Sequence, residues 1–199
     1  MKTLRNKLIK LGIAALALPF AFHAPSSLAN TAEATVQIEV ADSTLTLTNT
    51  AALDFGEVIV YIGEAEATLR LNPSDSSLTP TNGANNERFM PVGGTPQAAE
   101  FEISGAPNST VNVTNNTATP LTLARPSGAH DFTLDDLRMS IGGAAGIALG
   151  AITLDGNGDA SFSLGGTLTS QLYPATLATT LLTDHGTYSA TLQLQVDYD

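Results

Sequence analysis

The sequence contains no cysteine, no tryptophan and few basic residues. Without cysteine, neither disulfides nor thiolate metal sites can stabilise the protein, so its stability must come from apolar burial and backbone hydrogen bonds. The absence of tryptophan disfavours an aromatic platform for sugar binding. No lysine follows Lys10, and the chain carries nineteen acidic residues against eight basic ones.

The basic residues are also unevenly placed, and their positions predict the compartment. Lys2, Arg5, Lys7 and Lys10 precede an apolar run over residues 11–22, and the small residues Ser27 and Ala29 follow it. This order is typical of a secretory signal peptide, and the run is shorter than the ~20 residues that cross a bilayer. We expect residues 1–29 to be a signal peptide cleaved after Ala29, with a retained anchor as the alternative. The protein is then exported to the periplasm, the cell surface or the medium.

The predicted mature part, residues 30–199, has the size of one domain and is strongly acidic. It holds four basic and nineteen acidic residues, a formal net charge of −15. This charge excludes nucleic acid and anionic lipid as expected partners, because both require a basic surface. No second apolar run of spanning length follows residue 29, so we expect no integral membrane segment.

Alternating apolar and polar residues dominate the mature part and predict β-strands with one face in the core. The alternation is clearest over residues 188–198, where Tyr188, Leu192, Leu194, Val196 and Tyr198 face one way, and we expect one long strand there. It recurs at Val36, Ile38 and Val40, and then at Leu45 and Leu47. Further strands are expected at about 55–62, 67–71, 98–104, 110–114, 120–123, 137–141, 147–154 and 160–168.

No stretch after residue 30 sustains the apolar stripe of a helix. Residues 72–94 are rich in Ser, Pro, Asn and Gly, and we expect a long polar loop there. About ten short strands with frequent turns predict an all-β fold, a single antiparallel immunoglobulin-like β-sandwich.

Catalytic chemistry has little support in the sequence. The only imidazoles of the mature part are His130 and His185, each next to an aspartate, and sequence adjacency is not an orienting hydrogen bond. We interpret both as turn residues. The paired carboxylates of Asp135 and Asp136, and of Glu64 and Glu66, are expected in any chain this acidic. The prediction is that the protein is not an enzyme and has no catalytic residues.

One string resembles a calcium loop, because Asp155, Asn157 and Asp159 space oxygen ligands by two residues. The match is incomplete, since an EF-hand would have a bidentate Glu where Gly166 stands. A hairpin turn between the flanking strands explains the same residues without metal. We expect no cofactor, with calcium at these three residues as the alternative.

Several motifs, taken in order, resemble a known family. They are Leu-Asp-Phe-Gly at residues 53–56, Ala-Glu-Phe-Glu-Ile-Ser-Gly-Ala-Pro at 99–107, Phe-Ser-Leu-Gly-Gly-Thr-Leu at 162–168, and Gly-Thr-Tyr at 186–188. Together they resemble the exported bacterial domain-of-unknown-function family 4402. The first and last are also similar to the spore coat protein U domain and to archaic chaperone–usher pilins.

The pilin resemblance implies an incomplete sandwich that is completed by an N-terminal strand of the next subunit. This chain lacks the cysteine pair usual in those pilins. On this resemblance Val36, Ile38 and Val40 are the candidate donor strand, and Tyr188, Leu192, Leu194, Val196 and Tyr198 the candidate acceptor. The alternative is that residues 35–41 form the first strand of a self-sufficient domain.

The leading hypothesis is a non-catalytic structural or adhesive surface protein, a pilus-like or matrix subunit. Its expected partners are other copies of itself, other surface proteins and a periplasmic chaperone. The second hypothesis is a secreted sandwich that binds carbohydrate or calcium through residues 72–94 and the turn at Asp155–Asp159.

Overall fold

The computed structural model describes residues 44–124, 131–172, 180–181 and 185–199. These residues form strands and turns with no helix, and every strand pairing among them is antiparallel. The expected all-β antiparallel sandwich is therefore confirmed. The predicted signal peptide and Val36, Ile38 and Val40 lie outside the described residues.

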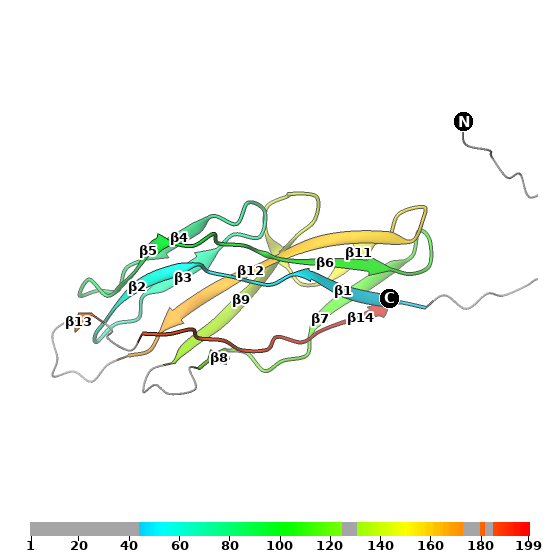
Figure 1. Ribbon diagram of the computed structural model, residues 1–199. Helices are drawn as coiled ribbons and strands as arrows, with labels where there is room; N and C mark the ends of the chain where they lie inside the picture. The colour runs from blue at the N-terminus through cyan, green and yellow to red at the C-terminus, as the bar shows by residue number, and fades with distance from the viewer. Residues whose placement is uncertain (1–43, 125–130, 173–179, 182–184) are drawn as a thin grey trace, which may run out of the picture. The chain divides into compact units, whose positions relative to one another are not determined.

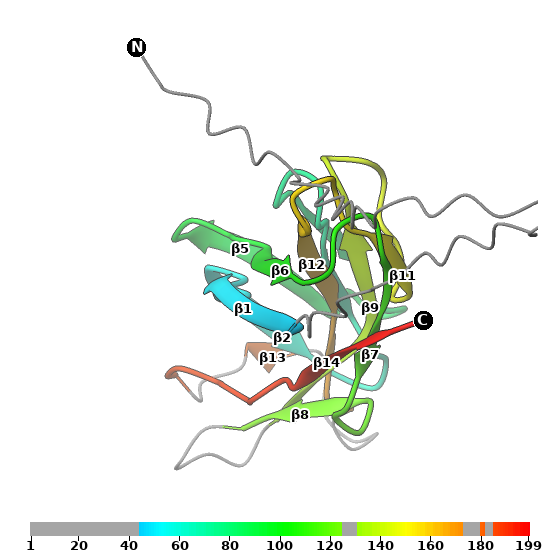
Figure 2. The same ribbon diagram turned by 90° about the vertical axis from the view of Figure 1, so that its right-hand side faces the viewer.

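The strands form three sheets (Figures 1 and 2). The first and largest contains β1 (Thr46–Ala51), β6 (Ala99–Ser104), β12 (Asp159–Ser170), β3 (Thr68–Leu71), β4 (Leu78–Thr81), β9 (Phe132–Ser140), β8 (Leu121–Leu123) and β10 (Ile147–Ala148). The second is ordered β11 (Ala151–Thr153), β7 (Thr110–Asn115) and β14 (Leu194–Tyr198). The third is ordered β13 (Thr180–Leu181), β2 (Glu57–Ile62) and β5 (Arg88–Gly93).

The long strand β12 holds the first sheet together (Figure 1). Its first half pairs with β6 and its second half with β3, while β9 pairs along its other edge. Phe162, Leu164 and Leu168 of β12 are buried. The strand therefore contributes to the core along most of its length.

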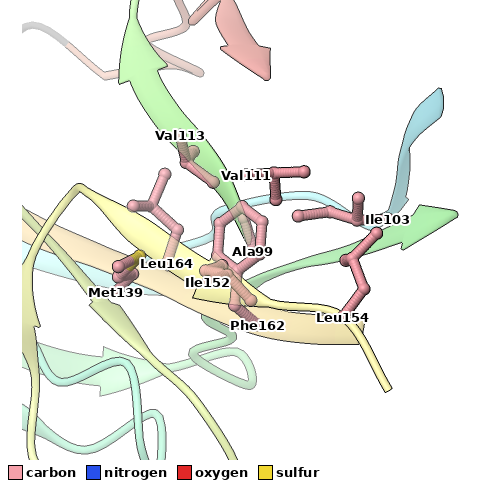
Figure 3. Packing of buried hydrophobic residues seen from close by; sticks show 9 residues of the cluster. All are labelled: Ala99, Ile103, Val111, Val113, Met139, Ile152, Leu154, Phe162 and Leu164. Carbon is pink, nitrogen blue, oxygen red and sulfur yellow. The ribbon is translucent and has the colours of Figure 1, made fainter. Parts of the chain in front are cut away.

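The core consists of two apolar clusters, one beneath each smaller sheet. The first lies between the first and second sheets (Figure 3) and contains Ala99, Ile103, Val111, Val113, Met139, Ile152, Leu154, Phe162 and Leu164. The second lies between the first and third sheets and contains Val60, Ile62, Ala67, Leu69, Phe89, Phe132 and Leu168. Because both clusters draw on β9 and β12, one continuous sheet supports the whole sandwich.

The prediction of a loop over residues 72–94 is wrong in part, because β4 and β5 lie within it. β4 pairs with β3, and β5 pairs with β2. Phe89 is only 2 % exposed, and Leu78 packs against the same cluster. These two apolar anchors hold short strands that contain proline and glycine and lie among turns rich in serine and asparagine, and composition alone therefore suggested a loop.

The prediction of one strand over residues 188–198 is also wrong in extent, because only Leu194–Tyr198 forms β14. β7, its ladder partner, ends at Asn115, which pairs with Leu194. Before that point Ser189 makes an isolated bridge with Ala124. The alternation continues before Leu194, but the described residues offer no continuous partner strand there, and regular strand structure requires one.

A buried carboxylate joins two loops next to the third sheet. Glu87 is fully buried and accepts hydrogen bonds from the backbone N–H groups of Ala65 (3.1 Å) and Asn85 (2.8 Å). Burial alone would raise the pKa of Glu87, but its backbone hydrogen bonds outweigh burial and lower the pKa. Gly63 and Gly83 lie so close to the carboxylate that a Cβ on either would crowd it.

Candidate functional site: an open seam between β1 and β14

Two strands leave a backbone edge outside the ladders of the described residues. Within the described part of the chain, β1 pairs only with β6 and ends the first sheet, and β14 pairs only with β7 and ends the second. The C-terminal stretch, red in Figures 1 and 2, runs alongside β1, and the two strands approach each other. We call the strip between residues 45–55 and residues 188–198 the open seam. Unpaired strand edges of this kind can accept another strand.

The side chains along the open seam are apolar but incompletely covered. Leu47 and Phe101 on one side, and Leu192, Leu194 and Val196 on the other, are half-buried and pack against the first core cluster. A cavity of about 440 Å³, the small pocket, lies between them and is lined by Leu47, Asn49, Phe101, Asn116, Leu192, Gln193, Leu194 and Gln195. Inner-face residues of a closed sandwich would be fully buried, so no strand among the described residues covers this edge.

A larger cavity of about 890 Å³, the large pocket, lies farther along the same two stretches of chain. Residues 53–60 line it on one side and residues 185–188 on the other. Phe132 and Leu168 of the second cluster also line it, and the Phe132 and Tyr188 rings meet edge to face at 4.7 Å. The Leu-Asp-Phe-Gly and Gly-Thr-Tyr motifs, far apart in sequence, therefore border one cavity.

At the other end of the open seam, the C-terminal strand is tied down by a hydrogen bond. The Tyr198 hydroxyl accepts from the Ala106 backbone N–H at 2.8 Å. The N–H of Gly105 in turn donates to the Gly158 carbonyl at 2.8 Å. The Ser-Gly-Ala-Pro end of the second motif thus connects β14 to the turn that precedes β12.

That turn is the candidate calcium loop, and its first carboxylate already has backbone partners. Asp155 Oδ1 accepts from the N–H groups of Asn157 (2.8 Å) and Asp159 (2.9 Å). The N–H groups of Asp159 and Asn157 hold the pKa of Asp155 below its ordinary value. Among the described residues no group of three or more His, Asp or Glu side chains is arranged to hold a metal ion.

The expected hairpin at this turn is wrong in one respect. β11 before the turn belongs to the second sheet, and β12 after it belongs to the first. The turn therefore connects two layers of the sandwich instead of two paired strands.

The sequence-predicted residues are only partly brought together. Tyr188, Leu192, Leu194 and Val196 line the open seam as half-buried side chains, while Tyr198 is 41 % exposed at its end. His185 lines the large pocket, but His130 lies outside the described residues. Sequence reasoning missed Phe101 as a lining residue of the small pocket and Phe132 as a lining residue of the large pocket. The available signals were the motif at 99–107, which contains Phe101, and the motifs at 53–56 and 186–188, which border the large pocket.

Residues 45–198 match the family described as "Domain of unknown function (DUF4402)". The chain belongs to this family. The DUF4402 match begins at Leu45 and ends at Tyr198. It therefore includes both sides of the open seam, and Val40 lies before its first residue. No curated protein and no solved structure matches the chain. Within the described part of this DUF4402 protein, no helix has the length and apolar character needed to cross a membrane.

Proposed function

We propose that this DUF4402 protein is a non-catalytic, exported structural or adhesive subunit that binds partners by accepting a β-strand into its open seam. The observation that carries the proposal is the combination of two strand edges that have no ladder partner among the described residues with a half-buried apolar row between them. An inserted strand gains backbone hydrogen bonds from the edges and apolar contacts from the row.

The candidate donor is the alternating segment at residues 35–41. Val36, Ile38 and Val40 supply three apolar side chains with the two-residue spacing that one face of a strand requires. The segment precedes the residues matched by the family, which is compatible with a role outside the domain that carries it. A second copy of the chain is the proposed source of the strand, and a periplasmic chaperone would cover the open seam before assembly.

The test compares residues 30–199 with a form that lacks residues 30–41. We expect the longer form to associate into oligomers by light scattering, and the shorter form to stay monomeric and melt at a lower temperature. A synthetic peptide of residues 31–42 should bind to the shorter form and restore its melting temperature.

A matched pair of variants separates strand insertion from other effects of the segment. Replacing Val36, Ile38 and Val40 with serine removes the inward side chains and should abolish association. Replacing Thr35, Gln37 and Glu39 with serine changes the outward side chains and should leave it intact. If the longer form is a monomer and deleting residues 30–41 leaves its melting temperature unchanged, the proposal is contradicted. A monomer that the deletion destabilises instead shows that the segment completes its own domain.

A further inference from the structure

The large pocket is poorly matched to the strand that this chain itself can offer. The open seam extends for about 30 Å, at ~3.3 Å per residue, whereas Val36, Ile38 and Val40 span only about 13 Å. Residues 30–43 contain no aromatic residue and no larger apolar side chain than Ile38. Placed over the small pocket, the three side chains leave the large pocket uncovered. Placed over the large pocket, they bring no aromatic ring to the Phe132–Tyr188 pair that lines it.

The lining of the large pocket favours a bulky occupant. Val58, Val60, Phe132 and Leu168 provide apolar surface, and the Tyr188 ring stands edge-on to Phe132. An aromatic side chain packs well against such a pair, whereas an unfilled void loses contacts with every atom that lines it. The cavity volume lies within the range that binds compact ligands or anchor side chains.

The charge around the large pocket disfavours binding of the N-terminal segment of a second copy. Its described lining includes the exposed carboxylates of Asp54 and Glu57 and no lysine or arginine. The segment at residues 30–43 carries Glu33, Glu39 and Asp42 and no basic residue. Like charges across an interface disfavour binding, and opposite charges favour it.

We infer that the large pocket receives a bulky aromatic side chain from an extended, lysine- or arginine-flanked segment of a different protein. The inference rests on the proposed function, since the anchor reaches the pocket by lying in the open seam. The pocket then sets partner preference, and a segment from another protein binds more tightly than one from a second copy.

The experiment measures peptide binding to the full chain carrying serine at positions 36, 38 and 40, so that its own segment does not compete. The first probe is the native peptide of residues 31–42. Two further peptides carry phenylalanine in place of Ala34 or of Val40. Each of these three peptides is also made with Glu33 and Glu39 replaced by lysine. Two phenylalanine positions are needed because the inserted strand can run in either direction along the open seam, and each direction places a different end of the peptide over the large pocket. We expect one phenylalanine–lysine peptide to bind on the order of tenfold more tightly than the native peptide.

A matched pair of tryptophan variants tests the location. Thr187 is exposed and lines the large pocket, so Thr187→Trp should place an indole ring in the pocket, compete with the phenylalanine anchor and remove the gain from it. Thr191 is exposed and lies outside the described pocket lining, so Thr191→Trp should preserve the gain.

The outcomes separate the inference from the proposed function. Equal binding of all peptides overturns the inference and leaves strand insertion supported. Binding of the phenylalanine–lysine peptide alone supports the inference and rejects donation by a second copy. No binding by any peptide overturns both.

Discussion

At the scale of single residues, Gly158 shows how the turn before β12 packs against the motif at 99–107, at the end of the open seam. Its φ is +92°, and a Cβ there would collide with the Gly105 carbonyl oxygen. We predict that Gly158→Ala lowers the free energy of unfolding by about 1–3 kcal/mol, because both the backbone angle and the contact must change. Gly156 in the same turn has open space around its Cβ position, so Gly156→Ala should stay near the wild type. Equal urea midpoints for the two variants would contradict this account.

Glu87 provides a pH-dependent test at the same scale. Its folded pKa lies below the ordinary value of 4.5, so its carboxylate form stabilises the fold above pH 4.5. That contribution is lost as the pH falls through the folded pKa. We predict that Glu87→Gln lowers the urea midpoint at pH 7, and that its difference from the wild type shrinks below about pH 4.5.

The control for Glu87 is Glu100→Gln, which changes an exposed carboxylate on β6. This variant should follow the wild-type midpoint across the pH range. A Glu87→Gln difference that is constant with pH would mean that the lost stability does not come from the ionised carboxylate.

At the scale of elements, β14 is attached along one edge. In the described part of the chain its ladder partner is β7, and the Tyr198 hydroxyl bonds its end to Ala106. We predict that Tyr198→Phe costs about 1 kcal/mol and accelerates amide hydrogen exchange in β14 while β12 stays protected. Tyr61→Phe changes a tyrosine of β2 instead and should leave β14 exchange unchanged. Uniform acceleration in both strands after Tyr198→Phe would contradict a local attachment.

Elements with a complete apolar face were predictable from sequence, and elements defined by their partners were not. Residues 160–168 were expected as a strand and lie in β12, whose alternation reflects burial against both clusters. Residues 147–154 were expected as one strand, but β10 pairs with β9 and β11 with β7. Local pattern does not record that a chain leaves one sheet for another. β4 and β5 were missed for a similar reason, since pairing with β3 and β2 stabilises them.

The half-buried side chains of the candidate site were predictable, but the opening between them was not. Alternation at Leu45 and Leu47 and over residues 188–198 indicated the apolar row, because burial on one face leaves a local pattern. The unpaired edge of β1 and the large pocket arise from which strands are neighbours, and no local pattern encodes that. The two motifs that border the large pocket lie more than a hundred residues apart in sequence.

At the scale of the whole molecule, acidic charge opposes both folding and association. The formal net charge is −11 for the full chain, and the ion pair between Arg138 and Asp136 is exposed at both ends, 37 % and 41 %. Such an exposed pair contributes little, whereas repulsion among many carboxylates acts throughout the molecule. Added salt screens both kinds of interaction, and the repulsion that it weakens should be larger than the attraction that it weakens, so salt should stabilise this protein.

We predict that raising NaCl from about 10 mM to about 500 mM increases the melting temperature, because the Debye length falls from about 30 Å to a few ångströms. Association through the open seam should increase in the same range, since the copies that meet are both acidic. Calcium chloride at matched ionic strength separates screening from binding at Asp155 and Asp159. An equal shift is expected from screening alone, and a larger shift that Asp155→Ala removes would establish a calcium site. A melting temperature that falls with NaCl would instead mean that attractive charge pairs dominate the fold.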